Sequence, residues 1–260
     1  LAQQFGSRDL AGFGVADLGL AITAAGALFD YLALTQRSAL PHLTRIHAER
    51  EDDYVRLDAA TRRNLELTET LRGEAAPTLL SVLDSTASGM GTRLLRHWLH
   101  HPLTDRSVLA ARRDAIGALL EADAHAALHA QLKRAADVER IAARIALKSA
   151  RPRDLSGLRD TLARLPELVA ALPAATPHLA ALAARLAPRA GLCDLLTQAI
   201  LPEPASVLRE GGVVNDGFDA ELDELRALTR DAGAFLLEME TRERERTGFQ
   251  NLRFGYNRVQ

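Results

Sequence analysis

Residues 216–247, DGFDAELDELRALTRDAGAFLLEMETRERERT, contain no proline and predict a single long helix. Asp216 is placed to cap its N-terminus, and Asp219 falls in its first turn. No apolar residue lies between Met239 and Thr247, so we expect a helix about 45 Å long that leaves its core and projects into water. From Phe218 onward, apolar and small residues alternate in steps of four and three, as in a coiled-coil seam: Leu222, Leu225, Thr229, Ala232, Leu236 and Met239.

The composition of the whole chain favours packed helices. Of the 260 residues, 47% are hydrophobic but only 4% are aromatic, so alanine, leucine and valine must supply most of the core. Breaks at 73–77, 102, 123, 136, 151–152 and 166–188 divide the middle of the chain into helices in series. The predicted fold is mainly α: a multi-helix core, a long projecting helix, and small β elements near both ends.

Three short segments predict the β elements. After an expected helix at 24–37, apolar and polar residues alternate between 43 and 57, and we place a domain boundary at the charged link 49–53. At 206–217, Gly211 and Gly212 separate two valine-containing runs, as in a small hairpin. After Gly248, a loose alternation predicts a strand through Leu252, Phe254, Tyr256 and Val259. Because the chain starts without methionine and stops on this strand, we expect a piece of a longer protein.

Charge and cysteine content narrow the class of protein. The formal net charge is -2, so the chain offers no general positive field for nucleic acid, and any DNA contact must be local. Cys193 is the single cysteine, which excludes an intramolecular disulfide and favours a reducing compartment such as the cytoplasm. The longest apolar run, between residues 17 and 30, is too short to cross a membrane, so we expect no membrane partner.

Two histidines four residues apart allow a metal site. His97 and His101 share a helix face, with Asp105 one turn on, and two imidazoles with a carboxylate can hold zinc or iron. However, no glutamate follows the first histidine, and the helix must end before Pro102, with Thr104 or Asp105 as the next N-cap. We therefore predict no metal and keep a metallo-hydrolase only as a weaker alternative. The same helix also carries an apolar stripe that we expect to be buried: Leu94, Leu95, Trp98 and Leu99.

Two charged groups of residues have a catalytic or binding reading beside a structural one. Asp58, Thr61, Asn64 and Glu66 could form a carboxylate site, but Asp58 three residues before Thr61 is the spacing of an N-cap, so we favour capping and buried hydrogen bonding. A basic row could hold DNA phosphates, but Asp137, Glu139 and Asp154 lie between its members, as on a solvated helix with ion pairs. The row consists of Arg140, Arg144, Lys148, Arg151 and Arg153.

Several motifs, in order and at matching spacing, resemble the MutS family of DNA mismatch-recognition proteins. They are LDAATRRNLELTETL, TLLSVLDSTASGMGTRLLRHWLHHPLTD, ARRDAIGAL, ARPRDLSGL, and ELDELRAL followed by RERERTGFQNLRFGYNRV. The resemblance covers nearly all of the chain and is weakest from 170 to 204. It implies that residues 1–50 are the C-terminal part of the connector domain, 51–240 the first part of the helical core and lever, and 241–260 the entry to the clamp.

By this resemblance the parent protein is a homodimer that binds mismatched DNA and ATP with Mg, and that works with downstream mismatch-repair factors. The long helix would then be a lever linking the ATPase to the DNA clamp. The family's phosphate loop ends in Gly-Lys-Ser/Thr, but Lys133 and Lys148 each follow a leucine, and no phenylalanine has Glu two residues later as in the family's mismatch reader. We expect no catalytic, cofactor-binding or metal-binding residue in this segment, with ATP and Mg bound elsewhere in the parent.

The resemblance also assigns site residues. In the clamp entry, Arg253 and Arg258 are candidate DNA contacts, whereas the metal reading of the histidines is not supported. A direct, non-specific DNA-backbone-binding module remains the alternative function. The structural motif residues are Asp58, Thr61, Asn64, Glu66, Gly91, Arg93, Trp98 and Arg112.

Overall fold

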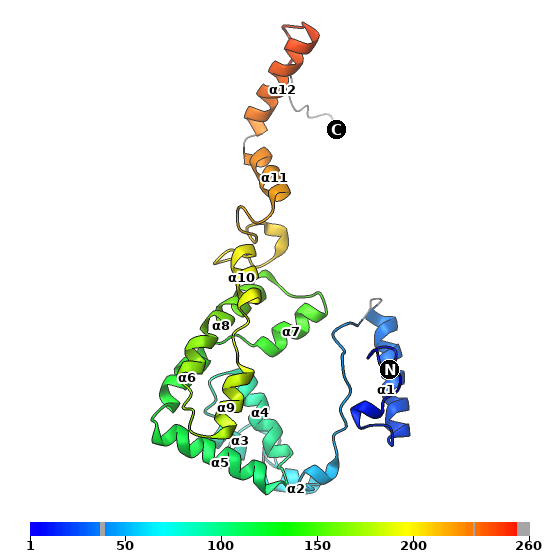
Figure 1. Cartoon of the computed structure of the whole chain (residues 1–260), viewed down its shortest axis with the longest axis vertical. Coiled ribbons are helices and arrows are strands. Elements are labelled where there is room, and N and C mark those ends of the chain that lie inside the picture. The colour runs from blue at the N-terminus through cyan, green and yellow to red at the C-terminus, as the bar shows by residue number, and fades with distance from the viewer. Residues whose placement is uncertain (37–39, 231, 254–260) are drawn as a thin grey trace. The chain divides into compact units, whose positions relative to one another are not determined.

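The computed structural model describes residues 1–36, 40–230 and 232–253, and these are mainly helical (Figure 1). No helix among them is long and apolar enough to cross a membrane. The α-helices are α1 (Gly19–Gln36), α2 (Ala59–Asn64), α3 (Leu79–Leu83), α4 (Gly89–His100), α5 (Arg106–Glu121), α6 (His125–Lys133), α7 (Val138–Ala146), α8 (Pro152–Ala170), α9 (Pro177–Arg185), α10 (Ala190–Ala199), α11 (Ala220–Arg230) and α12 (Ala232–Thr247). Short 3-10 helices are η1 (Ala11–Phe13), η2 (Glu51–Asp53) and η3 (Leu208–Glu210).

The chain divides into two compact units. The first contains residues 1–150 and 160–188, and the second contains 151–159 and 189–260. In the first unit, α9 packs on α5, where Ala115, Ala118 and Leu179 are buried and Leu119 and Leu172 pack against them. Two alanines on α5 leave room for the leucine of α9 to approach closely. This contact agrees with a core built from alanine and leucine.

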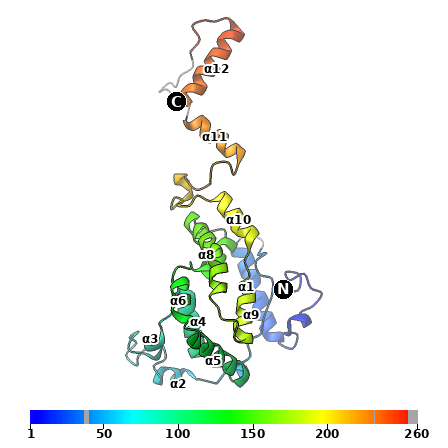
Figure 2. The same ribbon diagram turned by 60° about the vertical axis from the view of Figure 1, so that its left-hand side comes forward.

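In the second unit, α11 and α12 follow one another end to end in both views, at an angle to each other (Figures 1 and 2). The predicted long helix covers both of them, with Asp231 outside the described residues. Helix α11 begins at Ala220 rather than directly after Asp216, because the Asp219 carboxylate accepts a hydrogen bond from the Leu222 N–H at 2.9 Å. The prediction that Asp216 is the N-cap is therefore wrong, and Asp219 takes that role.

Most predicted breaks are confirmed, but the one at Pro166 is wrong. Helix α8 runs through Pro166 to Ala170, losing only the backbone donor that proline lacks. Helix α1 begins at Gly19, before the predicted start at 24, and the predicted end at 37 lies outside the described residues.

The β elements are much smaller than predicted. In the described residues they are isolated bridges, Tyr54 with Leu103 and Ile200 with Val214. The hairpin predicted at 206–217 is wrong, because Leu208–Glu210 forms η3 and Val213 instead accepts a hydrogen bond from Leu201 at 2.9 Å. The strand predicted after Gly248 falls mostly on residues 254–260, which lie outside the described residues.

Candidate functional site

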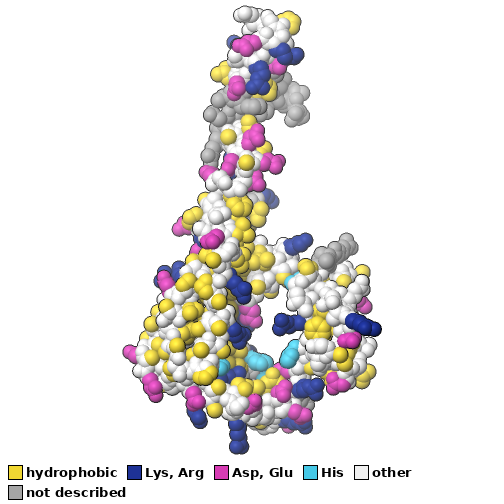
Figure 3. Space-filling model, viewed as in Figure 1, with side chains coloured by type: hydrophobic (Ala, Val, Ile, Leu, Met, Phe, Trp, Pro, Cys, Tyr) yellow, Lys and Arg dark blue, Asp and Glu magenta, His cyan; other side chains and the backbone are white. Residues whose placement is uncertain are grey.

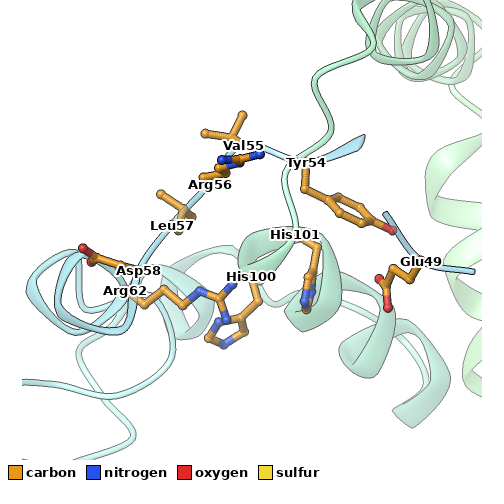
Figure 4. Close-up of a pocket in the computed structure, with 9 residues that line it drawn as sticks. All are labelled: Glu49, Tyr54, Val55, Arg56, Leu57, Asp58, Arg62, His100 and His101. Carbon is orange, nitrogen blue, oxygen red and sulfur yellow. The ribbon is translucent and has the colours of Figure 1, made fainter. Parts of the chain in front are cut away.

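Two adjoining hollows lie beside α2 and α4 in the first unit and share Arg62 and His100. The first has a volume of about 450 Å³ and the second about 500 Å³. Figure 4 shows the first, with the Arg62 side chain extending toward the His100 ring. Its lining residues are Glu49, Tyr54, Val55, Arg56, Leu57, Asp58, Arg62, His100 and His101.

The polar cluster at α2 is structural, as its spacing predicts, but it is not buried. Asp58 caps α2 by accepting the Thr61 N–H at 2.6 Å, and this hydrogen bond lowers the pKa of Asp58. Glu66 closes the other end with a φ of 46°, and its carboxylate accepts the Leu71 N–H at 2.7 Å. Both hydrogen bonds are exposed, and Asn64 faces solvent, so the expectation of buried hydrogen bonding is wrong.

The histidines of α4 contact one another rather than surrounding a common point. The His97 and His101 rings stack with centroids 4.5 Å apart, and Tyr54 packs edge-on against His101 at 5.5 Å. Asp105, the third member of the metal hypothesis, caps α5 by accepting hydrogen bonds from the Ser107 N–H and hydroxyl. No group of three His, Cys, Asp or Glu side chains that could hold a metal occurs in the described part of the chain.

His100 points to a different environment. Its Nε2 lies 3.1 Å from the Thr68 hydroxyl, so the ring is held at the boundary between the two hollows. Burial lowers the pKa of His100, and the positive charges of Arg62, His101 and Arg96 lower it further. The imidazole is therefore neutral at neutral pH, in surroundings that carry positive charge.

Arg93 joins α4 to the start of α7. Its guanidinium makes two hydrogen bonds to Asp137, at 2.8 and 2.9 Å, and two to Glu139, at 2.6 and 3.1 Å. Asp137 also caps α7 through the Arg140 N–H. The Arg93 hydrogen bonds hold the pKa of the Asp137 carboxyl below its usual value. Near the start of α4, a Cβ at Gly91 would lie 3.0 Å from the Cβ of Thr86, which explains glycine at this position.

The apolar stripe of α4 is only partly buried. Leu94 and Trp98 are 49% and 39% exposed, so the prediction that they are core residues is wrong, whereas Leu95 and Leu99 are half-buried. The Arg112 guanidinium lies 3.9 Å from the centroid of the Trp98 ring. A cation on an aromatic face thus covers the indole where the pattern predicted packed leucines.

At the base of α11, in the second unit, two side chains bind several backbone carbonyls. The Arg159 guanidinium on α8 donates to Ile200 and Leu201 at 3.0 Å and to Pro202 at 3.1 Å. The Asn215 amide donates to Thr197, Gln198 and Ile200 at 2.9 to 3.1 Å. These carbonyls belong to the end of α10 and the segment after it, where helical partners are lacking. Both side chains thus donate hydrogen bonds to carbonyls at and just after the C-terminal end of α10.

A third side chain connects this base to α11. Arg226 donates to the Val214 carbonyl at 2.8 Å and to the Asp216 carboxylate at 2.7 Å, and lies 3.5 Å from Asp223. Its side chain is only 23% exposed. We call Arg159, Asn215 and Arg226 the arm anchor, and α11 with α12 the arm. The anchor joins α8, α10 and the first turns of α11 through side-chain hydrogen bonds.

The arm itself is polar and acidic, with exposed apolar side chains. Residues 216–245 contain ten acidic residues and four arginines, a net charge of 4 - 10 = -6, and the arm itself, residues 220–247, contains eight acidic residues and five arginines, a net charge of 5 - 8 = -3. Figure 3 shows acidic side chains around α11 and mixed charges around α12. Phe218, Leu225, Leu237 and Phe249 are 44%, 55%, 62% and 70% exposed. Of the candidate DNA contacts, Arg253 is exposed and Arg258 lies outside the described residues.

The basic row is divided between the two units, and Arg140 within it is ion-paired. Arg140 lies 3.7 Å from Asp137, and the Asp154 carboxylate accepts the Arg151 N–H. Residues 140–148 belong to the first unit, and residues 151 and 153 to the second. The direct DNA-binding alternative therefore gains no geometric support from this row.

Comparison with known families places these features. MutS domain II matches residues 1–44, and MutS domain III matches residues 60–255. The chain belongs to the MutS family. In this MutS segment, α1 falls in the domain II match, and the second hollow, the Arg93 network and the arm fall in the domain III match, whereas the first hollow is lined mostly by residues 49–58, between the two matches. The segment is thus part of a MutS-type mismatch-repair protein.

Several of these residues had no signal in the sequence. Arg159, Asn215 and Arg226 bind carbonyls or carboxylates 10 to 43 positions away, beyond the reach of helix spacing rules. Arg62 and Arg96 fall within quoted MutS motifs, but only the structure brings them to one hollow. A count of arginines near His100 in the sequence would have been the one available hint.

Proposed function

We propose that this chain is the non-catalytic lever segment of a MutS-type mismatch-repair protein, linking the family's ATPase to its DNA clamp. The observation that carries the proposal is an acidic arm, within the domain III match, whose base is held by the arm anchor. A helix can transmit a displacement only if its base is held, and charged donors to several carbonyls provide such a hold.

The charge of the arm supports a mechanical rather than a DNA-gripping role. A net charge of -3 over residues 220–247, and of -6 over residues 216–245, does not favour the binding of phosphates along the arm. We propose that DNA contacts lie beyond the arm, at the clamp, where Arg253 and Arg258 stand at the entry. ATP and Mg would be bound elsewhere in the parent, since neither lysine here belongs to a phosphate loop. The homodimer and the downstream repair factors are likewise proposed for the parent protein.

The test interrupts α12 in a full-length MutS protein that contains this segment. Glu238 is exposed and lies 3.4 Å from Arg242, so Glu238→Ala removes only an exposed ion pair and is the matched control. Glu238→Pro also removes a helical hydrogen bond and costs the helix about 3 kcal/mol. Basal ATP hydrolysis should be kept by both variants, whereas stimulation of hydrolysis by a G·T duplex should fall several-fold only in Glu238→Pro.

Circular dichroism must show less helix in Glu238→Pro than in Glu238→Ala, which establishes that the arm has been interrupted. Equal stimulation by mismatched DNA in the two variants, despite that loss of helix, would contradict the lever role.

A further inference from the structure

The second hollow, beside α2 and α4, has an excess of positive charge. Its lining includes Arg62, Arg63 and Arg96 but only one acid, Glu69, so the formal excess is two positive charges. Thr68 and the His100 ring also line it. The first hollow differs, because its lining includes two acids, Glu49 and Asp58, and its Arg56 is paired with Asp52 at 2.5 Å. A bound anion would therefore lie in the second hollow.

The guanidinium groups of Arg62 and Arg96 are not paired with carboxylates within the described residues. The Nε of Arg62 is buried and has no hydrogen-bond partner there. Neither Arg62 nor Arg96 has a carboxylate within 4.0 Å in the described part of the chain, and Arg63 reaches only the Leu71 carbonyl at 3.4 Å. One turn away on α4, Arg93 binds two carboxylates, so helix α4 satisfies one of its arginines and leaves the other to the hollow.

The Arg62 Nε is itself buried, so an anion in the hollow would be bound by the terminal nitrogens of Arg62 and Arg96, which have no carboxylate partner in the described part of the chain. The charge excess matches a phosphate monoester, which carries about -1.5 to -2 at pH 7, better than a carboxylate or an internal phosphodiester with a single charge. Guanidinium forks fit the oxygens of phosphate in pairs. The Thr68 hydroxyl and the neutral His100 ring, which are hydrogen-bonded to each other, leave one uncharged donor between them for a ligand.

We propose that Arg62 and Arg96, with Thr68 and His100, form a binding site for a dianionic phosphate monoester. This site is independent of the lever role. A volume of about 500 Å³ leaves room for more than the phosphate itself, so a nucleoside monophosphate or the 5′-phosphate of a DNA end could supply the group.

The test titrates inorganic phosphate into the chain by calorimetry at constant ionic strength. We expect saturable binding that weakens about tenfold or more in Arg62→Gln and in Arg96→Gln, as expected for loss of a charged hydrogen bond. Arg113→Gln is the matched control, because Arg113 is exposed on α5 and lies 3.5 Å from Asp114, outside the hollow. Binding without saturation, or equal weakening in all three variants, would overturn the proposal.

Two further titrations distinguish the sources of the phosphate. Binding of adenosine monophosphate that depends on Arg62 supports a free nucleotide, and preference for a 5′-phosphorylated oligonucleotide supports a DNA end. Equal binding of the same oligonucleotide without its terminal phosphate would show that the hollow reads the DNA backbone, which contradicts a monoester site. If Arg62→Gln does not fold, Arg62→Lys takes its place, because it keeps the charge but loses the forked guanidinium. Its affinity for phosphate should lie between that of the wild type and that of Arg96→Gln.

Discussion

Replacing Arg159 by methionine should loosen the base of the arm without unfolding the rest of the chain. The side chain keeps a similar length but loses its three donors to the carbonyls of Ile200, Leu201 and Pro202. Methionine cannot donate a hydrogen bond, so these carbonyls must find water or stay unpaired. The change therefore removes the charged donor of the arm anchor while keeping a side chain of similar length.

The size of the effect follows from the exposure of the three bonds. A hydrogen bond from a charged donor contributes about 1.5 to 3 kcal/mol. The bond to Pro202 is exposed and contributes least, and Ile200 keeps its bond from Asn215 at 3.1 Å. The loss should therefore be near that of one to two full bonds, about 3 kcal/mol. Since 1.36 kcal/mol is a factor of ten, local opening should become about a hundredfold more frequent.

Hydrogen exchange measures this opening directly. The reporter amides are those of Leu201, Ala205 and Asn215, which donate to Val213, Gly212 and Ala199 at 2.9 to 3.1 Å. Their protection should fall about a hundredfold in Arg159→Met. In Arg159→Lys the protection should lie between that of the wild type and that of Arg159→Met. An ammonium keeps the charge but cannot bind all three carbonyls as the planar guanidinium does.

The matched control lies on the same helix. Arg153 is exposed on α8, so Arg153→Met removes a charge of the same sign without touching the anchor. Protection that stays within about threefold of wild type in Arg159→Met, or that falls equally in Arg153→Met, would refute the anchor. Equal loss of protection in α5 would also refute it, since that would show global unfolding rather than opening at the arm base.

Three other predictions concern the ion pair of α4, the indole beneath Arg112, and DNA. Because Arg93 lowers the pKa of Asp137, the pair contributes stability above the usual value of 3.8 that is lost as pH falls below it; Arg93→Met should show a smaller drop in the urea midpoint between about pH 5 and about pH 3, and an equal drop would contradict the pairing. Arg112→Met should destabilise the first unit by about 0.5 to 1 kcal/mol and shift the emission of Trp98, the single tryptophan, to the red, whereas an unchanged spectrum would count against the stacking. The chain alone should bind duplex DNA no tighter than about 10⁻⁴ M at physiological salt, equally for matched and G·T duplexes, and a reproducible preference for the mispair would place recognition within this segment.

Local signals predicted the helices well. The N-caps Asp58 and Asp105, and the helix ends before Pro102 and 123, depend on contacts within four residues, which spacing rules describe. Pro166 was misjudged because proline removes one donor but does not outweigh the other hydrogen bonds of a nineteen-residue helix. The hairpin failed for the opposite reason: the valines after Gly212 pair with the end of α10 rather than with the run before Gly211.

The hollows and the arm anchor were beyond sequence reasoning, although the residues themselves are plain in the motifs. Arg62 and Arg96 lie 34 positions apart in the sequence. Nothing in their spacing distinguishes them from Arg93 on α4, which binds carboxylates. Which arginine is satisfied depends on where α7 places Asp137 and Glu139, a tertiary outcome. The sequence thus shows which charged residues are present but not which of them form ion pairs.

The arm illustrates how the two kinds of information combine. The seam spacing and the charge of residues 216–247 predict a projecting helix, but a projecting helix alone would pivot at its base. Arg226 on α11 donates a hydrogen bond to the Val214 carbonyl. The next residue, Asn215, donates to the Ile200 carbonyl after α10, and Arg159 on α8 donates to that same carbonyl. These bonds form one continuous series through adjacent backbone groups. A displacement of α11 must therefore stretch charged hydrogen bonds before it can occur independently of α8, which is the property a lever requires at its root.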